Sequence, residues 1–204
     1  MKEQLLHLPK PHGLYHPNNE KENCGVGFIA HIKGKPSHQI TADALEMLAR
    51  MDHRGGCGCE SNTGDGAGIL TDIPHAFFIK EIKANFDADV EPGSYGIGNI
   101  FLPQDDNERT YCINILEKAI EDEGQTLVGW RDVPIDADKA DVGNTARESQ
   151  PVIKQLIIAS ADGIDNKAFE RALFVIRKHA SNSIRTDESL SQALLLNLGV
   201  VIIK

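Results

Sequence analysis

A cysteine followed by two closely spaced glycines limits the possible folds of this chain more than any other part of its sequence. Cys24 begins the run Cys-Gly-Val-Gly-Phe, and Arg54 follows thirty positions after it, with Gly55 next. If residues 1–23 are removed, Cys24 becomes the first residue and its free α-amine lies beside its thiol. A free α-amine titrates near neutrality, at about pH 7.7–8.0, so it can accept the thiol proton as a general base. The pattern indicates an amide-cleaving enzyme with an N-terminal nucleophile.

The composition is that of an acidic protein without a membrane segment. The 204 residues include 21 Lys and Arg against 30 Asp and Glu, a net charge of −9. An acidic surface does not attract nucleic acid or an anionic membrane, so neither is expected as a partner. No run reaches the roughly 18 apolar residues of a membrane helix, and the polar leader lacks the apolar centre of a secretory signal. A cytoplasmic location is expected.

The cysteine pattern argues against a metal site. Cys57 and Cys59 are the only close pair among the four cysteines, and a zinc site needs a matched second pair of Cys or His. We therefore predict no metal, and interpret Cys57 and Cys59 as packing or loop residues. Cys112 is interpreted as a buried residue.

Two further residues have competing interpretations. His53 next to Arg54 suggests a Cys–His pair, but an N-terminal nucleophile needs no histidine, so a structural turn is favoured. Arg54 itself could simply pin that turn by pairing with a carboxylate. Asp65 lies among glycines as in a phosphate-binding loop, yet no Gly-Lys-Ser/Thr follows, which excludes a P-loop.

Hydrophobic periodicity predicts an α+β chain with two parts. In the first part we expect strands over 25–32 and 69–74, and helices over 37–51, with Thr41 as N-cap, and over 75–86. The second part is predicted to contain strands at 97–102, 125–133 and 155–159, and helices at 107–123 and after an N-cap at Asp165. This βαββα order predicts a small module of roughly 85 residues, at about 93–180.

Taken together, the motifs resemble the class II, N-terminal-cysteine glutamine amidotransferases, and specifically the glutaminase domain of glutamate synthase large subunits. The matching segments are 23–28, 51–60, 62–68, 100–103 and 129–134. The Cys-Gly-Cys-Glu run at 57–60 and the module at about 93–180 separate this group from other class II amidotransferases. The resemblance extends from about residue 21 to residue 185.

The resemblance implies part of a four-layer αββα Ntn-hydrolase sandwich with the small α+β module inserted. Residues 1–23 would be a propeptide-like leader, and 24–204 the N-terminal part of the domain. Cys24 would attack the side-chain amide of glutamine, form a thioester and release ammonia, and water would then release glutamate. Arg54 would support the site through its turn, and Gly55 would present a backbone group there.

The same resemblance implies a longer parent enzyme. Ammonia would pass through a tunnel to a distant site with FMN and an iron–sulfur cluster, and there aminate 2-oxoglutarate. No cofactor is expected in this chain. The implied partners are glutamine, the rest of the large subunit with its synthase domain, and either a small NAD(P)H-oxidising subunit or ferredoxin.

Two parts of the family's site have no counterpart in this sequence. The family supplies its oxyanion hole from an Asn-Gly pair and holds the substrate amine with an Asp, whereas this chain contains no Asn-Gly. Loss of one oxyanion donor costs about 10²–10³ in rate. Residues 186–204 also depart from the family, apart from 189–191, as expected for a frameshift or mispredicted gene end. A truncated non-catalytic fragment, or another class II amidotransferase, therefore remains an alternative.

Overall fold

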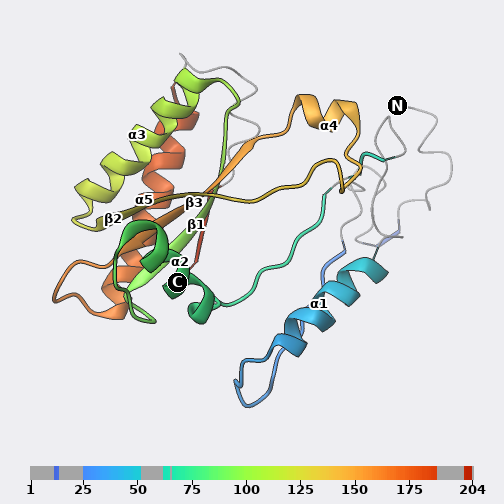
Figure 1. Cartoon of the computed structure of the whole chain (residues 1–204), viewed down its shortest axis with the longest axis horizontal. Helices are drawn as coiled ribbons and strands as arrows, with labels where there is room; N and C mark the ends of the chain where they lie inside the picture. The colour runs from blue at the N-terminus through green and yellow to red at the C-terminus, as the bar shows by residue number, and fades with distance from the viewer. Residues whose placement is uncertain (1–11, 14–24, 52–61, 65, 188–199, 204) are drawn as a thin grey trace. The chain divides into compact units, whose positions relative to one another are not determined.

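The computed structural model describes residues 12–13, 25–51, 62–64, 66–187 and 200–203 (Figure 1). Their contacts divide the chain into two compact units. Unit 1 comprises residues 1–71 and 141–145, and unit 2 comprises residues 72–140 and 146–204. Each unit has its own set of helices or strands and is described separately.

The main element of unit 1 is the helix α1, His38–Arg50, which confirms the predicted helix. Its N-cap is Ser37, whose extended backbone (φ −154°, ψ 149°) is typical of that position. The prediction of Thr41 as N-cap is wrong, because the helix has already begun three residues earlier. Before the helix, Gly34 donates its N–H to the carbonyl of His31 at 2.8 Å and adopts a left-handed φ of +64°. Glycine takes that angle without steric cost, so the chain can turn there.

Neither strand predicted for the first part of the chain is present in the described residues. The runs 25–32 and 69–74 form no ladder, and the sheet of the described chain contains neither of them. Most of their apolar side chains are exposed, with Val26 at 87%, Phe28 at 90% and Leu70 at 77%, whereas Ile73 is buried in the second core cluster. Residues that favour strands do so because their side chains fit a pleated, half-buried surface. A strand forms only where a partner completes its hydrogen bonds.

Unit 2 is built around a four-stranded antiparallel sheet. Its strands are β1 (Tyr95–Leu102), β2 (Thr126–Asp132), β3 (Val152–Ala159) and β4 (Val200–Ile203), in the order β2-β3-β1-β4. The helices α3 (Asp106–Asp122) and α5 (Asn166–Arg185) make the two crossovers. The short α4 (Asn144–Glu148), whose first two residues are assigned to unit 1, precedes β3. This is the split β-α-β arrangement of ferredoxin-like folds. The strand β4, which pairs with β1, was not predicted.

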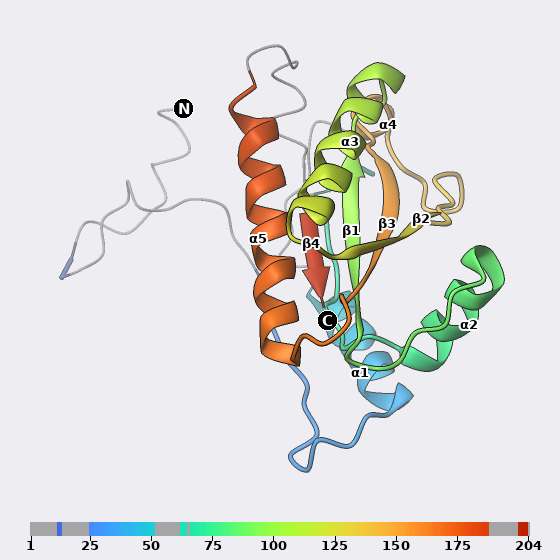
Figure 2. The ribbon, with the colours of Figure 1, turned by 90° about the vertical axis from the view of Figure 1, so that its left-hand side faces the viewer.

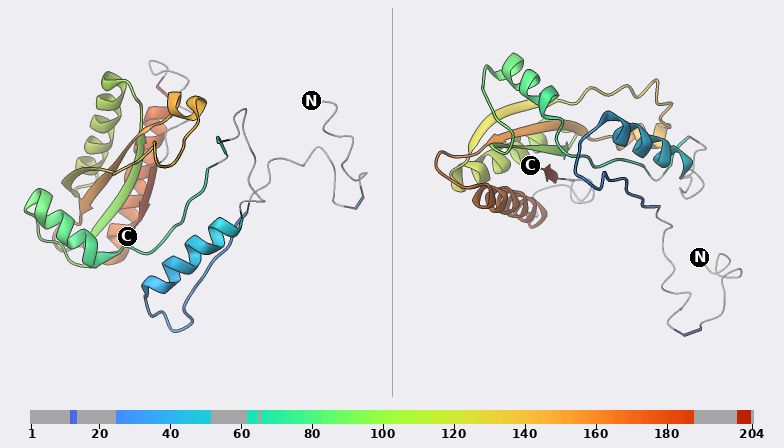
Figure 3. Two further views of the ribbon diagram at one scale, coloured as in Figure 1. Left: turned by 45° about the vertical axis from the view of Figure 1, so that its right-hand side comes forward. Right: turned by 90° about the horizontal axis from the view of Figure 1, so that it is seen from below.

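Alternation along β1 produces a core on each face of the sheet. Ile100 and Leu102 belong to a buried cluster with α3 and α5, whereas Tyr95 and Ile97 belong to a second cluster with α2 (His75–Phe86). Figure 2 shows α3 and α5 side by side over one face of the sheet. The view from below in Figure 3 shows α2 on the opposite face.

Side-chain caps explain where the two crossover helices begin. Asp105 accepts hydrogen bonds from the N–H groups of Asn107 and Glu108, both at 2.9 Å, at the start of α3. Asp165 accepts the N–H of Ala168 at 2.7 Å, which confirms it as the N-cap of α5. Each cap satisfies backbone donors that the first turn leaves without a helical acceptor.

Candidate functional site

The predicted site residues Cys24, Arg54 and Gly55 lie outside the described residues. His53, Asp65 and the Cys57–Cys59 pair also lie outside them. The structure does describe segments that lie next to these residues in the sequence. Two such segments, the run from Gly25 and the end of α1, belong to unit 1.

Gly27 brings these two segments into direct contact. A β-carbon on Gly27 would lie 2.5 Å from Sδ of Met47, in the last turn of α1, and 2.8 Å from Cε of Met51, the C-cap of that helix. Only glycine allows the backbone to approach the two methionines this closely without moving them. The run that follows Cys24 is therefore packed on the last turns of α1.

This contact lies close in the sequence to both predicted site residues. Cys24 precedes Gly27 by three residues, and Arg54 follows Met51 by three residues. Three residues of fully extended chain reach about 10–11 Å at most. Cys24 and Arg54, thirty positions apart in the sequence, are therefore each joined to the same contact by a short stretch of chain.

Asn62 anchors the glycine-rich run 62–68. The side-chain amide of Asn62 donates to the carbonyl of Asp141 at 3.1 Å, which ties the run to residues 141–145 of the same unit. Gly66 has a φ of +86°, and no atom lies within 4 Å of the β-carbon position of either Gly66 or Gly68. The left-handed angle explains the glycine at 66, whereas Gly68 tolerates a larger residue.

Cys112 is the free cysteine that lies within the described residues, and its burial argues against a role as the nucleophile. Its side chain is completely buried on α3, which confirms the interpretation from the sequence. Burial, with a further contribution from Glu108, raises the pKa of this thiol to about 11. The thiol therefore stays protonated at neutral pH, and the thiolate is the reactive form of cysteine.

The motif at 129–134, which carried part of the resemblance, has a structural role. Gly129 lies against the ring of Phe86, so α2 packs directly on the backbone of β2. Trp130 donates its indole N–H to Oε1 of Glu117 at 2.8 Å and thereby joins β2 to α3. The two residues hold helices on opposite faces of the same strand.

Arg131 of the same motif organises a polar row across three strands. Its Nε donates to Oε2 of Glu81 in α2 at 2.9 Å, and a second nitrogen donates to Oε1 of Gln155 in β3 at 2.9 Å. Gln155 in turn donates to Oδ1 of Asn99 in β1 at 3.1 Å. The guanidinium also lies 5.5 Å from the centre of the Phe77 ring. The motif thus fixes α2 on the sheet, and nothing in the sequence signals its partners Glu81 and Gln155.

A second polar contact that sequence reasoning missed joins the start of α2 to the start of β1. Nδ1 of His75 lies 2.8 Å from the hydroxyl of Tyr95. Burial raises the pKa of the Tyr95 phenol. The pair provides the buried hydroxyl with a polar partner.

Within the described ranges, no group of three His, Cys, Asp or Glu side chains is arranged to hold a metal ion. None of the helices in that same part of the chain is long and apolar enough to cross a membrane.

Residues 24–199 match the family of class-II glutamine amidotransferases. The match begins at Cys24, the predicted nucleophile, and it continues past residue 185, where the resemblance read from the sequence stops. Since it covers most of the chain, the chain belongs to the class-II glutamine amidotransferases.

The chain is also similar to glutamate synthases from bacteria, plants and fungi. It is 47% identical over 176 residues to the glutamate synthase [NADPH] large chain of Bacillus subtilis, which covers 86% of this chain and 11% of that protein. It is 38% identical to the ferredoxin-dependent glutamate synthase 1 of Arabidopsis thaliana over 83% of this chain and 10% of that protein. For the glutamate synthase [NADH] of Saccharomyces cerevisiae the identity is 35%, over 95% of this chain and 9% of that protein. The chain spans about a tenth of the length of these relatives.

Proposed function

We propose that this chain is the N-terminal glutaminase region of a glutamate synthase large subunit, with Cys24 as its nucleophile. The observation that carries the proposal is that the family match begins at Cys24 itself. The packing of Gly27 on Met47 and Met51 supports it, because Cys24 and Arg54 each lie only three residues along the chain from this contact.

The proposed fold is part of an αββα sandwich. The exposed side chains of Val26, Phe28 and Leu70 are consistent with runs that become strands when further strands of a complete domain cover them. Residues 1–23 are proposed as a leader that is removed before Cys24. Residues from about 93 to 180 are proposed as a module inserted into that sandwich.

In the proposed reaction, the α-amine of processed Cys24 takes the thiol proton. The thiolate attacks the side-chain amide carbon of glutamine, and the C–N bond of the resulting tetrahedral intermediate breaks. The α-ammonium returns its proton to the leaving nitrogen, which departs as ammonia, and a thioester remains on Cys24. Water then cleaves the thioester, releasing glutamate and regenerating the thiol. Arg54 is proposed to support the site through its turn, and Gly55 to present a backbone group.

The proposed parent enzyme uses the ammonia elsewhere. FMN and an iron–sulfur cluster would supply the electrons for reductive amination of 2-oxoglutarate in the part of the longer polypeptide outside this chain. The proposed partners are that synthase part and either a small NAD(P)H-oxidising subunit or ferredoxin.

The test is the intact mass of the purified protein before and after incubation with 6-diazo-5-oxo-norleucine, a glutamine-analogue electrophile. We expect a mass that lacks residues 1–23 and one stoichiometric adduct on Cys24. Cys24→Ser should abolish the adduct, and Cys112→Ser, which removes a buried thiol, should leave it unchanged. An unprocessed protein without adduct would instead support a non-catalytic fragment.

A second measurement separates the glutamate synthase from other class II amidotransferases. In the full-length protein, glutamine hydrolysis should be coupled to the consumption of 2-oxoglutarate and an electron donor. Hydrolysis that is independent of 2-oxoglutarate would support a different ammonia acceptor.

A further inference from the structure

The helix α5 is a positively charged element in a negatively charged chain. Its twenty residues include five Lys and Arg and only one acidic residue, Glu170, whereas the whole chain has a net charge of −9. Its buried side faces the core with Phe169, Leu173 and Ile176, among others. The cations therefore belong to the side of the helix that the unit does not use for its own packing.

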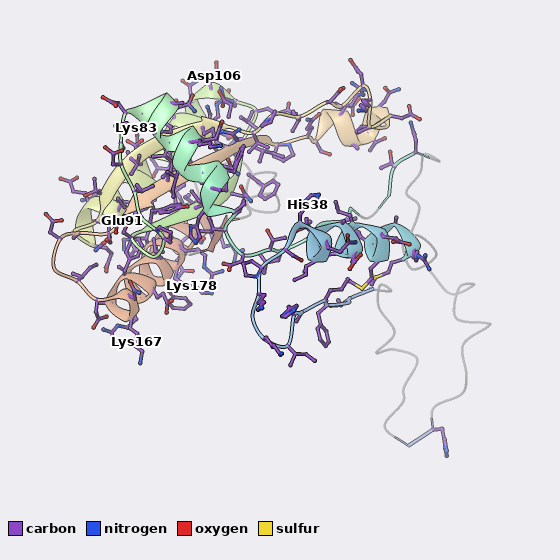
Figure 4. The ribbon with its side chains drawn as sticks, turned by 60° about the horizontal axis from the view of Figure 1, so that its bottom comes forward. His38, Lys83, Glu91, Asp106, Lys167 and Lys178 are labelled. Atoms are coloured by element: carbon purple, nitrogen blue, oxygen red, sulfur yellow. The ribbon has the colours of Figure 1, made fainter. Side chains whose placement is uncertain are left out.

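Four of these cations lie in line along the exposed side. Lys167, Arg171, Lys178 and Arg185 are separated by four, seven and seven positions, spacings that return to the same side of a helix with 3.6 residues per turn. All four residues are exposed. Figure 4 labels Lys167 and Lys178, which both lie on α5.

An aromatic ring lies in the middle of this line. Phe174 follows Lys167 by seven positions, and its side chain is 55% exposed. The guanidinium of Arg177 lies 5.5 Å from the centre of its ring. Aromatic and Arg side chains are enriched in protein interfaces and dominate their binding energy. We call Phe174 with the four aligned cations the basic face of α5.

Stability of the unit does not explain the basic face. None of the ion pairs recorded between described residues involves a cation of α5, although such pairs occur on α1, α2 and α3. Lys167 and Arg171 are four positions apart, where like charges destabilise a helix. Only Arg185, in the last turn, benefits from the helix dipole.

We propose that the basic face of α5 docks onto an acidic surface with an apolar centre in another part of the same polypeptide. The inference rests on the proposed function, in which this chain is one part of a longer enzyme. The relatives support this occupant, because the matched region is only 9–11% of their length and most of each polypeptide lies outside it.

Two other occupants fit less well. A nucleic acid would be repelled by the acidic remainder of the chain. A second copy related by a two-fold axis would bring the same face against itself, with like charges opposed. An acidic surface within the same polypeptide meets neither obstacle.

The test uses the full-length polypeptide with the photo-crosslinking residue p-benzoylphenylalanine in place of Phe174. Irradiation should give an intrachain crosslink to a segment rich in Asp and Glu, identified by peptide mass spectrometry. Because the contact is electrostatic, its yield should fall by about fivefold or more at 1 M salt or in the double variant Arg171→Glu, Lys178→Glu. The same photo-residue at Asn114, which is exposed on α3, is the control.

Several outcomes would overturn the proposal. These are a yield at Phe174 no higher than at Asn114, a crosslink to a second copy or to nucleic acid, and a yield that salt does not change. Arg171→Glu with Lys178→Glu should not lower the thermal unfolding temperature of the 204-residue chain, and a large loss of stability there would instead make the basic face structural. Glutaminase activity of the unirradiated protein is measured separately. A crosslinked protein without that activity would remove the proposed function and keep the docking.

Discussion

Gly129 in β2 lies directly against the ring of Phe86 at the end of α2. A β-carbon at position 129 would be 2.5 Å from Cδ1 of that ring. The register of β2 against β3 also shifts between Leu127 and Gly129, which is a bulge or irregularity in the ladder. An irregular ladder with glycine is a common way to let another element approach the backbone of a strand closely.

Gly129→Ala should therefore destabilise unit 2 by about 1–3 kcal/mol, because the new methyl group displaces a packed aromatic ring. Chemical denaturation monitored by circular dichroism measures this loss. Introducing Phe86→Leu into the same variant should make the alanine substitution much less costly, since the ring is the obstacle. Gly68→Ala, where no atom lies within 4 Å of the β-carbon position, is the control. Equal effects at positions 129 and 68 would contradict the role of the ring.

Arg131→Met should destabilise the protein by about 1–3 kcal/mol, because it leaves the half-buried carboxylate of Glu81 without its charged donor. The two side chains are 18% and 32% exposed. Arg131→Lys should recover only part of the loss, since an ammonium cannot bridge both Glu81 and Gln155 as the planar guanidinium does. The matched control is Lys118→Met, which breaks the exposed Lys118–Asp122 pair and should cost less than about 0.5 kcal/mol. Full rescue by lysine would show that charge alone matters.

Asp165→Ala should lower the free energy of unfolding by about 1 kcal/mol, within a range of roughly 0.5–2 kcal/mol for lost N-caps. The substitution removes the acceptor for the N–H of Ala168. Asp165→Asn keeps a side-chain acceptor and should retain most of the stability. Asp162→Ala removes the same charge three residues earlier without removing the cap. If thermal unfolding cannot distinguish the two alanine variants, the cap does not stabilise α5.

The stability of the fold should fall at high pH through Cys112. In the unfolded chain the thiol ionises near its ordinary pKa, about 8.5–9, whereas burial raises the pKa of Cys112 to about 11 in the folded protein. The folded state therefore binds the proton more tightly. The associated stability is fully present below pH of about 8.5 and is lost as pH rises toward about 11.

Denaturant unfolding between pH 8 and pH 11 tests this linkage. The free energy of unfolding should fall more steeply with pH in the wild type than in Cys112→Ala, which lacks the titrating group. The comparison of slopes matters, because the alanine variant also loses packing at every pH. Parallel slopes would mean that the folded and unfolded thiols ionise alike.

The helices were predictable because their signals are local. The α2 helix and the Asp165 cap of α5 follow from apolar spacing and capping residues within a few positions of sequence. The strand predictions over 25–32 and 69–74 are wrong for the described structure, and the reason is not local. Val26 and Phe28 have the right chemistry for a strand, but hydrogen-bonded partners decide whether one forms.

For the predicted site, too, the sequence identifies candidate residues, whereas their packing contacts are seen only in the folded chain. Cys24 and the Arg54-Gly55 pair are predicted from residue types in short motifs, and the family match begins at that cysteine. Gly27 was part of the motif, yet its contact with Met47 and Met51 required the packing of the run on α1. Nothing in the residues around Gly27 identifies two methionines twenty or more positions away as its neighbours.

Local sequence therefore determined the family, the four long helices and the Asp165 cap of this protein. Tertiary structure decided the strand order β2-β3-β1-β4 and the pairing of β4 with β1. It also decided which residues Gly129, Trp130 and Arg131 contact. The physical reason is the range of the interactions. Helical hydrogen bonds and caps join residues three or four positions apart, whereas Arg131 meets Glu81 across 50 positions of chain. Such a contact forms only when the whole sheet and its helices are assembled.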